Sequence, residues 1–180
     1  MRAALLRLVL ALLLGAGAAL GVLTWLEDAD ERAFGGAGDR VLAAVEGLRD
    51  DRVHVSDDGR PLLDEQGEAA IAAAIAERDL PIYVVVWQES RAAGYDSPNQ
   101  AAEQMLHLLD EPAALVLWQG PDSSTTRTWP GHRVVFTGTD GTPVRAQPEY
   151  LGDAALRLPE WLAQLPDEPL QALQAPEARG

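Results

Sequence analysis

Four carboxylates stand just after three predicted strands of this 180-residue chain, and they are its candidate metal ligands. Asp57 and Asp58 follow the first strand, Glu89 follows the second and Asp122 follows the third. In open parallel sheets, ligands bind in the crevice outside the carboxyl ends of the strands, so these side chains are expected to converge there. Carboxylate oxygens suit Ca²⁺ or Mg²⁺, and a Mg²⁺ held by them could polarise a phosphate ester. The alternative is a solvated rim of acids, because acidic residues are frequent throughout the chain.

Other sequence patterns that would indicate catalysis do not occur. The chain has no cysteine, so it has no thiolate nucleophile, thiolate metal site or disulfide. Its three histidines, His54, His107 and His132, show no metal-binding spacing. A nucleophile elbow, a phosphate loop and a dinucleotide glycine fingerprint are also missing from the sequence. We therefore predict no catalytic residue, and no cofactor other than weakly bound calcium or magnesium.

The polar stretch at residues 123–133 combines hydroxyl, aromatic and arginine side chains. Exposed aromatic and arginine side chains often anchor protein interfaces, which makes three residues candidate partner-binding residues: Arg127, Trp129 and Arg133. The alternative is a mobile loop whose Trp129 folds onto the domain.

The elements that would position these side chains alternate between strand and helix. Apolar residues predict strands at 52–56, 82–87 and 113–118. Helical spacing of apolar residues predicts a first helix with Asp39 as its N-cap and a second over residues 64–78. A third helix is predicted with Ser97 as N-cap and Pro98 at the first helical position, and it ends near residue 110.

The order of these elements predicts an α/β fold. Crossovers of a dozen or more residues between successive strands favour parallel pairing with right-handed connections. Residues 82–87 are apolar at every position, which is typical of a central parallel strand covered by helices on both faces. The predicted fold class is therefore a three-layer α/β domain with a mostly parallel central sheet.

Two further features are predicted after the third strand. Residues 132–146 indicate two short strands joined around Asp140-Gly141, which would add an antiparallel hairpin at one edge of the sheet. Residues 153–158 are expected to form a helix that stops at Pro159, where another helix opens.

The amino-terminal segment has the length and composition of a membrane anchor. Residues 8–26 contain only one polar residue, Thr24, and as a helix they would be about 28 Å long, close to the thickness of the hydrocarbon core. Arginines before this run and carboxylates after it orient the amino terminus inward and the rest of the chain outward. The alternative is a secretory signal peptide cleaved after the small residues Ala16-Gly17-Ala18. Both interpretations place the domain outside the cytoplasm.

The predicted organisation has four parts. Residues 1–26 form the transmembrane anchor, 27–38 a flexible linker, 39–165 the α/β domain and 166–180 a disordered tail rich in proline. All 28 acidic residues follow Leu26, with only 12 arginines, which gives the exported part a net charge of −16. Such a surface repels nucleic acid, so nucleic-acid binding is not expected.

The order of elements resembles that of the TPM domain family, which comprises membrane-tethered exported α/β domains. The resemblance covers roughly residues 52–142, and its motifs are "VHVSDD", the helix with Ile71 and Ile75, "PIYVVVWQES", Gly94 and "AALVLW". It implies weak binding of divalent cations, and some members are acid phosphatases. Matched residue by residue, the resemblance carries a cation-binding role only to Asp57 or Asp58.

Three functions are compatible with the sequence. The first is a single-pass, outward-facing domain that takes part in protein binding or assembly at the bacterial cell envelope, without catalysis. The second is a weak phosphatase that depends on a divalent metal. The third is a secreted domain that binds a small solute in the crevice at the strand ends.

Overall fold

The computed structural model describes residues 36–90, 94–120, 122–137, 143–145 and 148–173. The chain divides into two units, Met1–Gly36 and Ala37–Gly180, and the described helices and strands lie in the second. The predicted transmembrane helix (1–26) and nearly all of the predicted linker lie outside the described residues. Among the residues that are described, no helix is both long and apolar enough to cross a membrane.

A four-stranded sheet forms the centre of the domain, in the order β1-β2-β3-β4. The strands are β1 (Val53–Val55), β2 (Ile82–Val86), β3 (Ala114–Trp118) and β4 (Thr125–Thr128). Strands β1, β2 and β3 pair in parallel, as the crossover lengths predicted. Strand β4 pairs antiparallel with β3, from Ala114 opposite Thr128 to Leu117 opposite Thr125. Its sequence, TTRT, has no apolar residue, so the hydrophobic pattern did not indicate a strand there.

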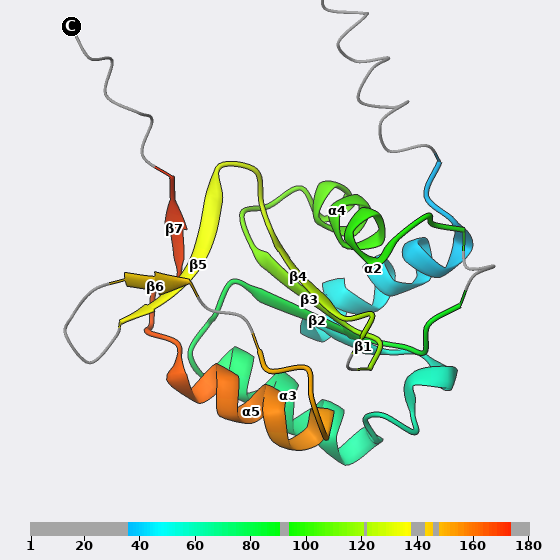
Figure 1. The fold of residues 1–180 in the computed structure, drawn as a ribbon, viewed down its shortest axis with the longest axis horizontal. Helices are drawn as coiled ribbons and strands as arrows, with labels where there is room; N and C mark the ends of the chain where they lie inside the picture. The colour runs from blue at the N-terminus through cyan, green and yellow to red at the C-terminus, as the bar shows by residue number, and fades with distance from the viewer. Residues whose placement is uncertain (1–35, 91–93, 121, 138–142, 146–147, 174–180) are drawn as a thin grey trace, which may run out of the picture. The chain divides into compact units, whose positions relative to one another are not determined.

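Four helices cover the two faces of this sheet (Figure 1). Helices α2 (Asp39–Asp51) and α4 (Pro98–Leu109) pack on one face, and α3 (Glu65–Glu77) and α5 (Ala154–Gln164) pack on the other. This arrangement confirms the α/β class with helix layers on both sides of a mostly parallel sheet.

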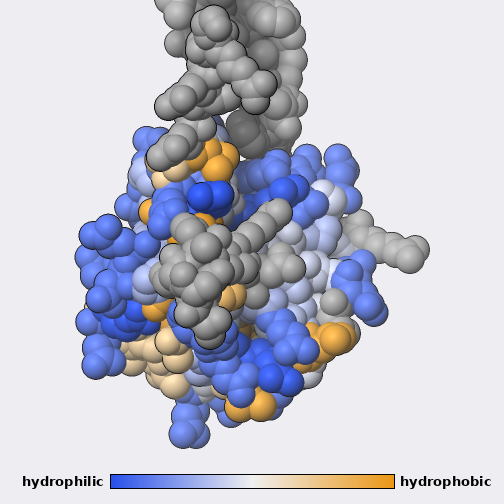
Figure 2. Space-filling model, turned by 60° about the vertical axis from the view of Figure 1, so that its left-hand side comes forward, coloured by the Kyte–Doolittle hydropathy of each residue, from blue (hydrophilic) through white to orange (hydrophobic). Residues whose placement is uncertain are grey.

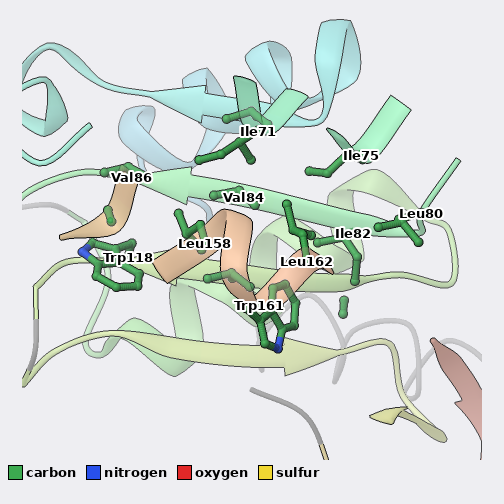
Figure 3. Packing of buried hydrophobic residues seen from close by; sticks show 14 of the residues in the cluster. Ile71, Ile75, Leu80, Ile82, Val84, Val86, Trp118, Leu158, Trp161 and Leu162 are labelled. Atoms are coloured by element: carbon green, nitrogen blue, oxygen red, sulfur yellow. The ribbon is translucent and has the colours of Figure 1, made fainter. Parts of the chain in front are cut away.

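The side chains of β2 alternate between two separate cores, which explains why the strand has no polar face. Val84 and Val86 pack with α3 and α5, whereas Tyr83, Val85 and Trp87 pack with α2 and α4. Figure 3 shows the first of these cores, where residues of α3 and α5 meet alternate residues of β2 and Trp118 of β3. Every residue of β2 and of β3 is buried. The prediction of a central strand buried on both faces is confirmed.

Three helices begin directly after a capping side chain, and in α5 this is Asp153, whose carboxylate accepts a hydrogen bond from the Ala155 N–H at 2.9 Å. The Asp64 carboxylate accepts a hydrogen bond from the Gly67 N–H at 2.8 Å, and α3 begins directly after it. The Ser97 hydroxyl accepts one from the Gln100 N–H at 3.2 Å, and Pro98 is the first residue of α4, as predicted. Helix α2 differs, because Asp39 is its first helical residue and the capping position is occupied by Gly38.

A second, three-stranded sheet has the order β6-β5-β7, with β5 (His132–Thr137), β6 (Pro143–Arg145) and β7 (Leu170–Ala172). The predicted antiparallel hairpin is present as β5 and β6, although its turn, residues 138–142, lies outside the described residues. Its predicted position was wrong, because the hairpin joins β7 in a separate sheet and the edge strands of the main sheet are β1 and β4.

Two predictions about the end of the chain were also wrong. Residues 170–172 form β7 against β5, so the predicted disordered tail contains a strand; residues 174–180 lie outside the described residues. The pairing is decided by main-chain groups of β5, which the tail's own sequence does not reveal. Pro159 does not separate two helices, because α5 runs through it from Ala154 to Gln164. Buried Leu158, Trp161 and Leu162 hold both halves of α5 against the core.

Candidate functional site

A short 3-10 helix after β1 brings Asp57 and Asp58 to the carboxyl end of the sheet. This helix, η1 (Asp57–Gly59), packs directly on the end of β2: the Ser56 N–H donates to the Val86 carbonyl at 3.1 Å. Gly59 is buried there, and a Cβ added to it would lie 2.2 Å from the Val86 carbonyl oxygen. A glycine is therefore required for η1 to approach β2 so closely.

Asp58 is bound by an arginine that the sequence analysis did not single out. One guanidinium nitrogen of Arg40, in the first turn of α2, lies 2.7 Å from both carboxylate oxygens of Asp58. The Ser56 hydroxyl donates a further hydrogen bond to the same carboxylate at 2.5 Å. The carboxylate is therefore neutralised by the chain itself, although 44% of the Asp58 side chain stays exposed.

The partners of Asp58 change its acidity. Partial burial acts to raise the pKa of Asp58, but the hydrogen bonds from Ser56 and Arg40 and the positive charge of Arg40 together lower it below its ordinary value of 3.8. A carboxyl whose pKa is lower in the folded than in the unfolded state stabilises the fold at neutral pH. This stabilisation is lost as the pH falls through the lowered pKa.

Replacing Arg40 with glutamine is expected to raise the pKa of Asp58, because the variant loses the charge and shortens the hydrogen-bonding side chain. A carboxyl-detected NMR titration of both proteins measures this change. The loss in the free energy of unfolding should stay below about 1 kcal/mol at neutral pH, since the pair is solvent-accessible. Arg49→Gln, on the exposed side of the same helix, is the control. An Asp58 pKa that is the same in Arg40→Gln and in the parent would contradict the assigned pair.

Trp87 directly follows β2, at the carboxyl end of the sheet, where open α/β sheets usually have their ligand crevice. Its indole is fully buried, with the Arg40 guanidinium carbon 4.5 Å from the ring centroid. The Tyr95 ring is stacked on the indole at a centroid separation of 5.7 Å and an interplanar angle of 14°. We call these three residues, Arg40, Trp87 and Tyr95, the crevice plug. A guanidinium over an indole and stacked aromatic rings are both favourable contacts beyond simple burial.

A buried amide fastens the plug to the end of β3. Gln119 is only 7% exposed. With its amide oxygen facing the plug, it accepts hydrogen bonds from the Tyr95 hydroxyl at 2.7 Å and from the Trp87 indole N–H, while its NH₂ donates to the Ser123 carbonyl at 3.0 Å. Burial raises the pKa of Tyr95 despite the hydrogen bond to Gln119, so its hydroxyl stays protonated at neutral pH. Strands β2 and β3 and residue 95 are thus held together by a hydrogen-bonded network.

The four predicted metal ligands do not form one cluster in the described part of the chain. Asp57, Glu89 and Asp122 are exposed. The Ser123 hydroxyl donates to the Glu89 carboxylate at 2.5 Å, which links the ends of β2 and β3. No group of three or more histidine, aspartate or glutamate side chains is placed to hold a metal ion among the described residues. A weak cation site therefore stays a prediction from the sequence, and any such ion would compete with Arg40 for Asp58.

A small surface hollow of about 260 Å³ opens beside the plug at the start of α4. It is lined by Glu89, Ser90, Tyr95, Asp96, Ser97, Pro98 and Gln119. Its two carboxylates make it unsuitable for an anionic ligand, although it lies at a helix N-terminus.

The predicted partner-binding residues lie in β4, directly after β4 and in β5. Arg127 lies in β4 with its Nε 3.2 Å from a carboxylate oxygen of Glu103, on α4. Trp129 is half-buried and packs against the core under α2 and α4, as the alternative interpretation of this segment predicted. Arg133 is exposed on β5. The three side chains therefore do not stand together on an unstructured loop, and their role in partner binding stays a prediction.

Sequence reasoning missed the residues that fill the crevice. Arg40 and Tyr95 are distant in sequence from the strand ends, and Trp87 was interpreted as an ordinary core residue. Trp87 is indeed in the core, but its contacts with Arg40 and Tyr95 depend on the folded position of α2 and of residue 95. The only signal in the sequence was the position of Trp87 and Gln119, each directly after a buried strand.

Comparisons with known proteins found no protein-family model, no curated protein and no solved structure that matches this chain. The resemblance to the TPM domain family therefore stays a prediction that depends on the motifs quoted above.

Proposed function

We propose that this protein is a membrane-anchored domain that faces outward and binds another protein in the assembly of the bacterial cell envelope, without catalysis. The observation that supports this proposal best is the crevice plug. At the carboxyl ends of the parallel strands, where α/β domains usually bind small ligands, Trp87 is fully buried and in contact with Arg40 and Tyr95.

The plug makes this crevice an unfavourable place for a small molecule or a metal ion. A solute entering it would have to separate the stacked rings of Trp87 and Tyr95. A cation at Asp58 would have to displace the Arg40 guanidinium, which lies 2.7 Å from both carboxylate oxygens. Both alternatives, a metal-dependent phosphatase and a solute-binding secreted domain, therefore require contacts of the folded domain to be broken. Binding through the outer surface requires none of this.

A photo-crosslinking experiment tests the proposal in living cells. The photoreactive amino acid p-benzoylphenylalanine is placed singly at Leu42 on α2, at Leu156 on α5 or at Leu173 directly after β7, which are 48%, 55% and 54% exposed. We expect a protein adduct of one defined mass from at least one position, found in the membrane fraction and only after illumination. Cells kept in the dark are the control.

Phosphatase assays on the same protein separate the two main alternatives. If Asp57 and Asp58 hold a catalytic metal, the double variant Asp57→Ala, Asp58→Ala should lose turnover of a phosphate ester. The proposed function predicts no metal-dependent turnover above background in either protein and the same crosslinks in both. Turnover by the parent that the double variant lacks, together with no adduct at any position, would contradict it. Release of the protein into the medium would favour the secreted solute-binding alternative.

A further inference from the structure

Strand β7 pairs with β5 on one edge, and no described strand pairs with its other edge. The Leu173 N–H donates to the Gly131 carbonyl at 2.7 Å, and the Val135 N–H donates to the Pro169 carbonyl at 2.9 Å. These bonds show that the odd-numbered residues in and beside β7 point their main-chain groups at β5. In an antiparallel ladder the main-chain groups of the residues between the hydrogen-bonded ones point away from the partner strand. The N–H and C=O groups of Leu170 and Ala172 therefore face away from β5, with no hydrogen-bond partner among the described residues.

Strand β1 is an edge strand of the main sheet, and its outward main-chain N–H groups are hydrogen-bonded, unlike those of β7. In β1 the outward N–H groups belong to Val53 and Val55, and each has a side-chain partner. The Asp51 carboxylate accepts from Val53 at 3.1 Å, and the Glu68 carboxylate accepts from Val55 at 3.2 Å. Carboxylates that occupy outward N–H groups prevent another strand from pairing there. The same protection is not found on β7 in the described part of the chain, so this edge remains able to accept a strand.

The residues with outward main-chain groups on β7 also line a surface groove of about 550 Å³. Leu170 and Ala172 form part of its wall, together with Pro81 and Pro112, which stand just before β2 and β3. The remaining lining residues are polar: His132, Asp79, Asp167 and Glu168. A strand added to β7 would therefore place alternate side chains against an apolar wall and next to acids.

The charge of the groove indicates what kind of strand it would accept. Asp79 and Asp167 are paired with Arg52 at 2.9 Å and with Arg78 at 3.1 Å, but their side chains remain 87% and 92% exposed. Glu168 is exposed and has no ion-pair partner among the described residues. A second copy of this chain, whose net charge is −14, would meet these acids with acids of its own. A positively charged strand would be attracted.

Hydrophobic areas are small on the described part of the face drawn in Figure 2. Figure 2 shows a mostly hydrophilic face with small, separate hydrophobic areas. Binding on this side would therefore depend on main-chain hydrogen bonds and charge, with a modest contribution from Leu170.

We propose that the open edge of β7 binds an extended, positively charged segment of a partner protein as an added strand. Main-chain hydrogen bonds to Leu170 and Ala172 give affinity in this mode, and the side-chain pockets give selectivity. Apolar residues of the segment pack on Leu170, and basic residues lie beside Asp79, Asp167 and Glu168. The proposal rests on the proposed protein-binding function and names the surface and the chemistry of the partner.

The test measures binding of a defined peptide to the full 180-residue chain in a non-ionic detergent. The probe is a fluorescein-labelled peptide of about nine residues, the length of a long strand, with alternating valine and lysine. Its control has glutamate in place of each lysine. We expect anisotropy to report binding of the lysine peptide, weakening with added salt, and no binding of the glutamate peptide.

Two substitutions on the groove make the test specific for this edge. Ala172→Pro removes an outward N–H without touching a bond to β5, and should weaken binding about tenfold or more, because one hydrogen bond is lost and the ring obstructs an added strand. Ala172→Val retains the N–H and should bind as the parent does. Glu168→Arg, at an exposed residue, should weaken binding of the lysine peptide and allow binding of the glutamate peptide. Circular dichroism verifies that each variant is folded.

Three results would overturn this proposal. One is no binding of the lysine peptide by the parent at up to about 1 mM, the weak end of specific affinity. Another is equal binding by Ala172→Pro and Ala172→Val, which would place the peptide elsewhere on the surface. The third is a parent dimer that Ala172→Pro dissociates, which would make a second copy the occupant of the edge. If any of these three results is combined with a protein adduct from Leu42 or Leu156, the proposed function stands and only the assignment of the binding surface to β7 is wrong.

Discussion

Replacing Trp87 with alanine is expected to lower the free energy of unfolding by about 3–5 kcal/mol, the usual cost of truncating a fully buried large aromatic side chain. The indole is 0% exposed, and its removal leaves a cavity between Arg40 and Tyr95. The same change removes the indole N–H that donates a hydrogen bond to the amide oxygen of Gln119. Urea unfolding of the full chain in detergent, followed by circular dichroism, measures the difference.

Two comparisons show whether the loss comes from the plug. Trp129→Ala removes an indole that is only half-buried, and should cost less than Trp87→Ala. Added indole should raise the unfolding midpoint of Trp87→Ala, because it can refill the cavity, and should leave the parent unchanged. A loss below about 1 kcal/mol for Trp87→Ala would contradict the plug, since surface substitutions have effects of that size.

Replacing Gly59 with alanine is expected to cost about 3 kcal/mol, the upper end of the range for overpacked positions. The new methyl group would lie 2.2 Å from the Val86 carbonyl oxygen and 2.8 Å from its carbon. Both atoms belong to the main chain of the central strand, so they cannot move aside as the end of a flexible side chain can. Helix η1 would have to shift, breaking the hydrogen bond from Ser56 to Val86 and separating Asp58 from Arg40.

Gly36→Ala is the matched control, because a Cβ at Gly36 has nothing within 4 Å. Its effect on the free energy of unfolding should stay within about 0.5 kcal/mol. In the Gly59→Ala protein the pKa of Asp58 should also move back toward its ordinary value, which the NMR titration used for Arg40→Gln detects. A Gly59→Ala protein that keeps both the parent stability and the parent Asp58 pKa would show that η1 does not pack on β2 in this way.

Two surfaces of the domain, the carboxyl ends of the main sheet and strand β7 of the second sheet, have different consequences for function. At the carboxyl ends the chain fills its own crevice with the plug and neutralises Asp58 with Arg40. On β7 it leaves main-chain groups open beside exposed acids. Protein binding at β7 would therefore proceed without disturbing the packing of the crevice plug. Substitutions at Trp87 and at Ala172 should have independent effects on the free energy of unfolding and on binding.

Most of the main layers follow from local patterns in the sequence. Residues 82–86 and 114–118 are apolar throughout because helices cover both faces of the sheet, and that run of residues indicates a central parallel strand without knowledge of its partners. Asp64, Ser97 and Pro98 mark the starts of α3 and α4 because capping is a contact between near neighbours in the chain. The parallel order also follows, since the crossovers are too long for hairpins.

By itself, the sequence determined the α/β class, the three parallel strands, the starts of α3 and α4 and a hairpin formed by β5 and β6. Only the tertiary structure decided where β4, β7 and the hairpin pair, because TTRT and the proline-rich end become strands through main-chain bonds to distant residues. It also decided the chemistry of the candidate site. The four acids follow the strands as predicted, but Arg40, 18 residues before Asp58, reaches its carboxylate when α2 packs on the sheet. Charges that come from distant elements cannot be assigned from spacing along the chain.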